Sequence, residues 1–549
     1  MPTRVIDVRS EPLRLHITEQ IPALYTALSY CWGDITKVVK TERSTLETFQ
    51  SEIPIDELPR TIRDAISITR RLNVQYLWVD SLCIIQDSKE DWYAESARMG
   101  DIYDGALLVI AAIRSKNSDD GCFSNTYTYH RSGIKERVLR LRYHESTSQQ
   151  NLVYVRLTSR AYGDSSESTM GSGHHGRGSY DNGPLSTRAW ALQENVLARR
   201  ILFFTDDELT WRCLEARNCE CRPYVRRLQR YKTLLGFFES KQHHITNIAL
   251  SEWETEFRYM WWNLVSQYTQ RNLTYTTDRL TAISGLARRM NETTNDQYIV
   301  GLWRRTLAKD LMWFVTTWTM DYYKPPRASQ RHGTYLAPTW SWISVTGGVY
   351  EQINVHEALE ILDVELTQRN SDSTSLIQHG TLTVNAGLIP IRFRRVGDEA
   401  FVPIATHIDA KLNFNEKIWD EAGVRRYTYV AVDADMRDEN FQEYRVTSRK
   451  NQNGCSLIVG RKEGKRALLH CALVRFDIQP HGGSKEITEG ETYFLLHAAS
   501  DGEDAHHFLV LRRVQSEEQT FTRAGIVWCY DNNWRDKDLC RHKEPIRIV

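Results

Sequence analysis

The sequence predicts an α/β domain built on a parallel sheet, followed by a helical middle segment and a β-rich C-terminal domain. Short apolar runs alternate with helix-like segments between residues 25 and 112, which is the pattern of βαβ units. Aromatic residues then recur at helical spacing, and separate strand-like runs fill the C-terminal part. Because 549 residues exceed what one hydrophobic core usually serves, we expect three regions, 1–225, 226–350 and 351–549.

The first predicted strand is Tyr25–Cys31, where aromatic or apolar residues alternate with small polar ones before a turn at 32–34. A helix is expected after Pro59, because apolar residues recur at helical spacing from Ile62 to Leu72. The apolar run Tyr76–Asp80 then predicts a buried strand that ends in an acid.

A second helix at about 90–103 and an apolar strand at 106–112 complete this pattern. Ligand sites in such sheets form outside the carboxyl ends of the strands. Those ends carry residues 31–34 and 80–83, so a site is expected there.

Beyond residue 115 the apolar pattern weakens, and the Gly/Ser-rich stretch 163–183 predicts a mobile loop. Order returns with a helix over Arg188–Arg200 and a hairpin-like pair of strands over 201–213. Two aromatic stripes at helical spacing follow, Trp253–Tyr268 and Leu302–Trp318, and such stripes usually pack in a core. Strand-like runs in the C-terminal region are 380–391, 467–478, 491–498, 507–514 and 524–530.

The composition argues against several classes of function. Lys plus Arg and Asp plus Glu each total 70, so the net charge gives no attraction to nucleic acid or anionic lipid. The longest apolar run, Ala106–Ile113, is too short to span a bilayer, and residues 1–10 lack the apolar region of a signal peptide. We therefore expect a cytoplasmic protein without a membrane span.

Ten cysteines are scattered through the chain, several inside apolar runs, as expected of free thiols in a reducing compartment. Only Cys213, Cys219 and Cys221 cluster, and their spacing lacks the paired C-x-x-C of structural zinc sites. We expect no bound metal. The sequence also has no G-x-x-x-x-G-K-[ST], G-x-S-x-G or H-E-x-x-H motif.

Three segments together resemble the fungal heterokaryon-incompatibility (HET) domain. They are YTALSYCWGD at 25–34, LPRTIRDAI through YLWVDSLCIIQDSKEDWYAESARMGDIYDGALLVIAA over 58–112, and RAWALQENVLARRILFF at 188–204. Further segments, to about residue 350, look like those that follow the domain in long family members. The resemblance implies a role in non-self recognition and programmed cell death, with protein partners in that pathway and self-association through the HET domain.

The HET domain is in turn similar to TIR domains, which have a flavodoxin-like fold and in several lineages cleave NAD at the nicotinamide bond. The resemblance thus leaves two functions open, a signalling module that acts by binding partners and an NAD glycohydrolase with NAD as substrate. TIR enzymes place a catalytic glutamate on a helix shortly after a tryptophan. Glu95 resembles it, although the spacing from Trp92 is one residue shorter.

The helix pattern independently singles out Glu95. At about 100° per residue it lies in the same arc as the apolar face formed by Trp92, Met99, Ile102 and Tyr103. A carboxylate in an apolar stripe is costly unless it is paired or used, and desolvation raises its pKa. Glu95 is therefore the first candidate catalytic residue, and an ion pair with Arg63 or Arg98 is the alternative.

Glu194 is the second candidate acid, because it shares a helix face with Trp190. Three arginines nearby, Arg188, Arg199 and Arg200, offer a structural ion pair as the alternative.

Under the NAD glycohydrolase hypothesis, the acid binds the ribose hydroxyls or stabilises an oxocarbenium-like transition state. The expected pocket residues are Ser29, Tyr30, Trp32, Asp34, Asp80 and Trp92. Trp32 offers a ring that stacks on a base, or it packs in a tight turn with Gly33. Asp80 faces the same cleft as Glu95, or it caps the following turn.

Overall fold

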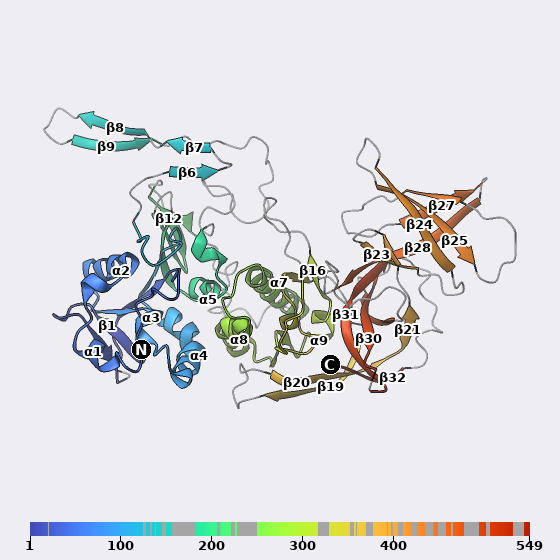
Figure 1. The fold of residues 1–549 in the computed structure, drawn as a ribbon, viewed down its shortest axis with the longest axis horizontal. Helices are drawn as coiled ribbons and strands as arrows, with labels where there is room; N and C mark the ends of the chain where they lie inside the picture. The colour runs from blue at the N-terminus through green and yellow to red at the C-terminus, as the bar shows by residue number, and fades with distance from the viewer. Residues whose placement is uncertain are drawn as a thin grey trace. The chain divides into compact units, whose positions relative to one another are not determined.

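A computed structural model gives the structure of the chain. It describes residues 1–19, 21–123, 128–131, 134–137, 139–144, 150–155, 183–205, 209–220, 226–227, 250–316, 329–351, 356–357, 359–368, 377–391, 394–396, 399–403, 410–419, 425–433, 443–447, 457–462, 465–476, 493–500, 505–515, 517–530 and 543–549. The chain divides into two compact units, Met1–Asn247 with Arg271–Thr294, and Ile248–Gln270 with Asn295–Val549. Figure 1 shows the first unit in blue to green.

The N-terminal unit is built on a nine-stranded sheet with the order β13-β12-β11-β10-β5-β3-β4-β1-β2. The four central strands run parallel, and β1 and β2 on one side and β11 to β13 on the other are antiparallel additions. The strands are β1 (Arg4–Asp7), β2 (Arg14–Ile17), β3 (Tyr25–Ser29), β4 (Tyr76–Trp78), β5 (Leu108–Ala111), β10 (Arg200–Phe204), β11 (Leu209–Cys213), β12 (Ala216–Cys219) and β13 (Arg226–Arg227). Two separate pairs are β6 (Thr128–Arg131) with β7 (Ile134–Arg137) and β8 (Leu139–His144) with β9 (Gln150–Val155).

The helices of this unit include those that cover the two faces of the parallel strands and those that pack outside them. They are α1 (Leu46–Ser51), η1 (Ile55–Glu57), α2 (Arg60–Arg71), α3 (Asp80–Cys83), α4 (Lys89–Gly105), η2 (Pro184–Thr187), α5 (Trp190–Val196), η5 (Thr276–Arg279) and α8 (Thr281–Thr294).

Helices α2 and α4 pack on opposite faces of β3 (Figure 1). The Tyr25 hydroxyl donates to the carbonyl of Ile102 on α4 at 2.6 Å, whereas Thr26 and Thr69 of α2 share a hydrogen bond of 2.7 Å. Successive strand residues point to opposite faces, so these two contacts fix the sides. The core lies between the sheet and these helices, where β5 is buried along its whole length.

The sequence-based expectation of an α/β unit with parallel strands is confirmed. The predicted strands that begin near residues 25, 76 and 106 become β3, β4 and β5, and the predicted helices become α2 and α4. The helix expected over Arg188–Arg200 is shorter, because its last residue already begins strand β10. Most of the predicted loop 163–183 lies outside the described residues.

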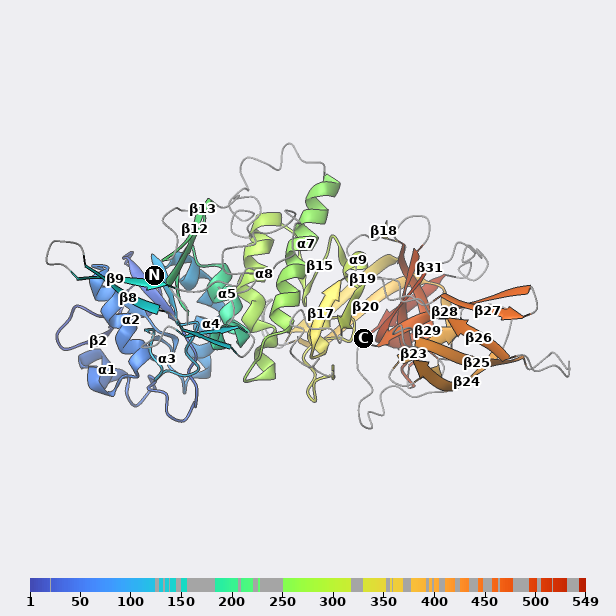
Figure 2. The ribbon, with the colours of Figure 1, turned by 90° about the horizontal axis from the view of Figure 1, so that it is seen from above.

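The C-terminal unit is rich in strands, as expected, and these are yellow to red in Figure 2. Its helices are α7 (Leu250–Thr269), α9 (Leu307–Asp310) and η6 (Trp342–Ser344). Its strands are β14 (Tyr298–Ile299), β15 (Leu302–Trp303), β16 (Trp313–Thr316), β17 (Gly348–Glu351), β18 (His356–Glu357), β19 (Glu360–Gln368), β20 (Ile377–Ala386), β21 (Leu388–Ile391), β22 (Arg394–Val396), β23 (Glu399–Pro403), β24 (Ala410–Trp419), β25 (Arg425–Asp433), β26 (Glu443–Thr447), β27 (Leu457–Lys462), β28 (Lys465–Phe476), β29 (Tyr493–Ser500), β30 (Ala505–Arg513), β31 (Thr520–Tyr530) and β32 (Glu544–Ile548). None of the described helices is long and apolar enough to cross a membrane.

One aromatic stripe behaves as expected and one does not. Trp253–Tyr268 falls within α7, but the described part of Leu302–Trp318, residues 302–316, forms β15, the single turn α9 and β16 in place of a long helix. The reason is a tight turn around the buried carboxylate of Asp310. It accepts hydrogen bonds from the Trp303 backbone N–H at 3.2 Å and from the Thr306 hydroxyl at 2.8 Å.

Gly301 lies just before this turn, and we predict that its replacement by Ala destabilises the C-terminal unit. Its φ is +92°, and an added Cβ would lie 2.6 Å from Nε1 of Trp342. Its carbonyl accepts two indole N–H groups, from Trp261 at 3.0 Å and from Trp342 at 2.8 Å. Gly301→Ala should lower the free energy of unfolding in urea by about 1–3 kcal/mol.

Gly333→Ala is the matched control, because a Cβ at Gly333 meets no atom within 4 Å. It should change the free energy of unfolding by less than about 0.5 kcal/mol. Equal losses of unfolding free energy in Gly301→Ala and Gly333→Ala would contradict the conclusion that position 301 requires glycine.

Candidate functional site

Glu194 lies on α5 and is 3% exposed. Its carboxylate accepts a hydrogen bond from the hydroxyl of Ser29, the last residue of β3. Ser29 pairs in register with Ala111, the last residue of β5. The acid is therefore anchored at the carboxyl ends of two neighbouring parallel strands.

This position is the switch point of the sheet. The chain leaves β3 through α2 on one face and reaches β5 through α4 on the other. Connections that diverge to opposite faces leave a crevice outside the strand ends, where ligands of open α/β sheets bind. The local fold thus directs Glu194 to the edge where the sequence predicted a site.

Three further polar groups lie around Glu194. Nη1 of Arg188 donates to the carbonyl of Tyr30, directly after β3. The Tyr30 hydroxyl donates to the hydroxyl of Ser81, at the start of α3, at 2.9 Å. Arg188 is half-buried.

Asp80 follows β4 and belongs to the same cluster. Its carboxylate accepts Nε1 of Trp32 at 3.0 and 2.9 Å and the backbone N–H of Ser81 at 2.7 Å. Asp80 therefore binds the following turn, which is one of its two expected roles, and it also orients Trp32. The other expectation was a cleft shared with Glu95, but Glu95 belongs to a separate network with Thr3 and Arg98. Burial raises the pKa of Asp80, and the nearby charge of Arg188 and the hydrogen bond from Trp32 oppose the rise.

The pKa of Glu194 is raised to about 7, chiefly because burial penalises the charged carboxylate. The positive charge of Arg188 and hydrogen bonds from Ser29 and Tyr103 favour the ionised form, whereas the negative charge of Asp80 disfavours it. A carboxyl group that titrates near neutral pH can serve as acid, base or electrostatic stabiliser.

The nearby cysteine is not a suitable nucleophile. Burial raises the pKa of the Cys31 thiol to about 11, and Arg188 only partly opposes this. The thiol therefore stays protonated near pH 7. The chemistry of the cluster rests on its carboxylates and its arginine.

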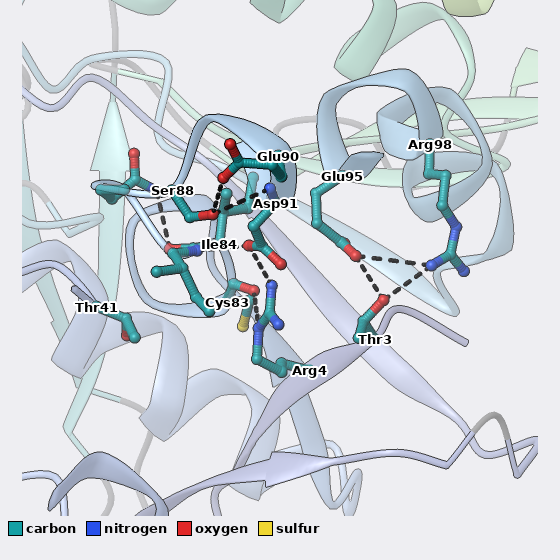
Figure 3. A network of polar contacts seen from close by, with 12 residues as sticks. Thr3, Arg4, Thr41, Cys83, Ile84, Ser88, Glu90, Asp91, Glu95 and Arg98 are labelled. Carbon is teal, nitrogen blue, oxygen red and sulfur yellow. Dashed lines mark hydrogen bonds and ion pairs between the residues drawn. The ribbon is translucent and has the colours of Figure 1, made fainter. Parts of the chain in front are cut away.

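Glu95 lies on α4 and belongs to a different network, which joins that helix to the N-terminal residues of the chain (Figure 3). It is 3% exposed, accepts a hydrogen bond from the Thr3 hydroxyl at 2.5 Å and pairs with Arg98 at 3.7 Å. Its other oxygen, Oε2, is buried and has no hydrogen-bond partner among the described residues. The predicted ion pair with Arg98 is present, and the catalytic role of Glu95 stays a prediction.

Next to Glu95, a second ion pair fixes the start of α4 (Figure 3). Asp91 pairs with Arg4 of β1 at 2.5 Å and also accepts the backbone N–H of Ile85 at 2.8 Å. Arg4 further donates to the carbonyl of Cys83 at 2.8 Å. These bonds join β1, the turn after α3 and α4, which indicates a structural role for this network.

The predicted pocket residues divide into two groups. Ser29, Tyr30, Trp32 and Asp80 meet around Glu194 and Arg188. Asp34 is exposed and bonds within its own turn to Thr36.

Among the described residues, Trp92 is linked to the cluster through Trp190. Its ring packs edge-on against that of Trp190, with centroids 6.2 Å apart. Trp190 begins the helix that carries Glu194.

Sequence reasoning missed two members of the site. Arg188 was considered only as a structural ion-pair partner, and Tyr103 only as part of an apolar helix face. The Tyr103 hydroxyl donates to the carbonyl of Leu28 at 3.0 Å and lies close enough to Glu194 to lower the pKa of its carboxyl. A buried tyrosine needs a partner for its hydroxyl, and this was the available signal.

Cys213 and Cys219 lie on β11 and β12, and Cys221 lies outside the described residues.

Residues 25–194 match the family model described as heterokaryon incompatibility protein (HET). The N-terminal unit carries a HET domain. The match begins at the first residue of β3 and ends at Glu194, so it contains every member of the cluster described above. No curated protein and no solved structure matches the chain significantly.

The raised pKa of Glu194 predicts a pH-dependent stability of the HET domain. The pKa is 4.5 ordinarily and about 7 in the folded protein, so the folded state binds this proton more tightly. The resulting stabilisation is complete below pH 4.5 and is lost as the pH rises through 7. Glu194→Gln keeps a neutral group, so relative to wild type it should gain on the order of 3 kcal/mol between pH 5 and pH 8.

Denaturant unfolding of both proteins at several pH values measures this difference. Arg188, Asp80, Cys31 and the hydrogen-bonding Ser29 and Tyr103 are present in both proteins, so their own titration largely cancels. A difference in the free energy of unfolding that does not change with pH would refute the shifted pKa.

Proposed function

We propose that this protein acts in heterokaryon incompatibility and that its HET domain hydrolyses the nicotinamide–ribose bond of NAD at Glu194. The observation that carries the proposal is a buried carboxyl group, with a pKa of about 7, at the switch point of a parallel sheet. Buried acids with such a pKa cluster at functional sites. In this account the chain is a cell-death effector that depletes NAD.

The strand order supports the link to TIR-like domains. In chain order the central strands are β3, β4, β5 and β10, and in the sheet they lie as β4-β3-β5-β10. This 2-1-3-4 order is that of flavodoxin-like folds, which bind their ligand between the first and third strands. Glu194 and Ser29 lie at that place.

The chemistry assigns a role to each group. The C1′–N bond breaks and its electron pair leaves with nicotinamide, while a water oxygen bonds to C1′ and gives up a proton. Ionised Glu194 stabilises the cationic sugar in the transition state and accepts that proton. Trp32, held by Asp80, offers a partly exposed ring for a base, and Arg188 carries N–H donors for ligand oxygens.

The second candidate is a signalling module that binds partners, including copies of itself, without turnover. The hydrogen bonds within the cluster favour it, because Ser29, Tyr103 and Arg188 already stabilise the Glu194 carboxylate. A satisfied polar cluster also fixes the packing of α4 and α5 on β3, which is a structural role.

Incubation of the purified full-length protein with NAD tests the proposal through release of nicotinamide. We expect release that rises with pH through about 7, as Glu194 ionises. Glu194→Gln should reduce the rate by at least about 10²-fold, by analogy with the loss of one electrostatic stabiliser. Glu95→Gln should retain most of it, since Glu95 belongs to the other network.

Thermal unfolding of each variant shows whether the fold is kept. Loss of release in folded Glu95→Gln with activity retained in Glu194→Gln would move the site to Glu95. Absence of release in wild type at high protein concentration would favour the signalling module.

A further inference from the structure

Residues 271–294 reach the HET-domain unit from the other unit. Residues Ile248–Gln270 belong to the C-terminal unit, Arg271–Thr294 belong to the N-terminal unit, and from Asn295 the chain belongs to the C-terminal unit again. The segment holds η5 and α8 and lies outside the HET match, which ends at residue 194. We call it the docked segment.

The docked segment clamps the backbone on both sides of Arg188. The Asn272 N–H donates to the carbonyl of Thr187 at 2.6 Å, and the Ala189 N–H donates to the carbonyl of Asn272 at 2.8 Å. Arg188 and Asn272 thereby form an isolated parallel bridge. Nη1 of Arg271 adds a bond to the carbonyl of Arg188 at 3.4 Å.

This clamp supplies what the local sequence lacks. Arg188 is extended between η2 and α5, and Ala189, the residue before α5, has no side chain that could cap the helix. The Ala189 N–H is satisfied by Asn272. The Arg188 N–H bonds locally to the Leu185 carbonyl at 3.1 Å, whereas the backbone groups on either side of it, the Thr187 carbonyl and the Ala189 N–H, bond to Asn272.

Helix α8 extends the contact to the helices around Glu194. Its Gly285 lies against Gly100 of α4 and the side chain of Gln193, since a Cβ on Gly285 would be 3.1 Å from the Gly100 Cα and 2.7 Å from the Gln193 Oε1. Arg288 donates to the Ala97 carbonyl at 2.9 Å. The close helix approach therefore depends on a residue without a side chain at position 285.

Asp278 gives a third contact, because its carboxylate accepts Nε1 of Trp190 at 3.4 Å. Trp190 is four residues before Glu194 on α5. Hydrogen bonds from the docked segment thus reach residues 187–190 at the start of this stretch, and the close approach of Gly285 to Gln193 lies beside Glu194 at its end.

We propose that the docked segment is a positioning element of the Glu194 site, which holds Arg188 and the start of α5 in place. The proposal rests on the proposed function for its catalytic consequence. The segment acts through Arg188 and α5 and touches no substrate. Residues 25–194, which match the HET model, would then not form a complete site without the docked segment.

The first test compares two substitutions of Asn272 in the full-length protein. Asn272→Pro removes the N–H that bonds Thr187, whereas Asn272→Ala keeps both backbone bonds. We expect Asn272→Pro to lower kcat/KM for nicotinamide release roughly 10²-fold, as a small displacement of catalytic groups does. Asn272→Ala should stay within about twofold of wild type.

The second test places a wedge in the α8 contact. Gly285→Ala adds a methyl group where Gln193 and Gly100 leave no room, and Gly333→Ala adds one in open space. The first should reduce release and the second should not. If Asn272→Pro does not fold, as judged by circular dichroism and thermal unfolding, Gly285→Ala carries the test.

The titration of the Glu194 carboxyl, followed by ¹³C NMR with Glu194→Gln to assign the signal, gives a readout independent of turnover. The clamp variants should move its midpoint by about one pH unit or more, because the charge of Arg188 and the burial both change. Arg188, Asp80, Ser29, Tyr103 and Cys31 all face this group.

The two failures are distinguishable. If wild type releases no nicotinamide, the proposed function fails, and a midpoint that still shifts in Asn272→Pro and Gly285→Ala supports the positioning role. A folded clamp variant with an unchanged midpoint and unchanged release overturns the proposal.

Discussion

A carboxyl group buried at the ends of parallel strands must have its charge compensated, and this constraint organises the HET-domain unit. Glu194 meets it through the Ser29 hydroxyl from β3, the Tyr103 hydroxyl from α4 and the charge of Arg188. Each partner comes from a different element, so strand register, helix packing and the extended link before α5 must all be correct together. The same burial raises the pKa of the acid toward 7. Burial of the Glu194 carboxyl therefore both costs folding free energy and gives the group a pKa that suits acid–base chemistry.

The two buried glutamates of this unit show how environment separates similar residues. Glu95 and Glu194 are equally buried, at 3% exposure each. Glu95 is tied to Thr3 and Arg98, and its neighbours Arg4 and Asp91 join β1 to α4. Glu194 lies at the switch point, near Asp80 and the half-buried Trp32. Burial alone does not distinguish the two acids, whereas their position in the sheet does.

Local patterns predicted β3, β4, β5, α2 and α4 well, because apolar spacing alone determines such buried elements. The site residues Ser29, Tyr30, Trp32 and Asp80 were also predictable, since they follow strands whose carboxyl ends share one edge. The choice between Glu95 and Glu194 could not be predicted, because it depends on which of the two glutamates lies at the carboxyl end of β3. The role of Asn272 was equally hidden, since its bonds to Thr187 and Ala189 use backbone atoms and leave no pattern in the sequence. The long helix predicted from the aromatic stripe at 302–318 was wrong for a related reason. The turn around Asp310 overrides the helical spacing of the sequence.

The central claim is that a ligand binds at the switch point beside Glu194. A structure determined with NAD or ADP-ribose bound tests it most directly. The account predicts a ribose hydroxyl within hydrogen-bonding distance of the Glu194 carboxylate, with Trp32 and Arg188 in contact with the ligand. A ligand seated against Glu95 and Arg98, or no binding to folded protein at millimolar ligand, would contradict it.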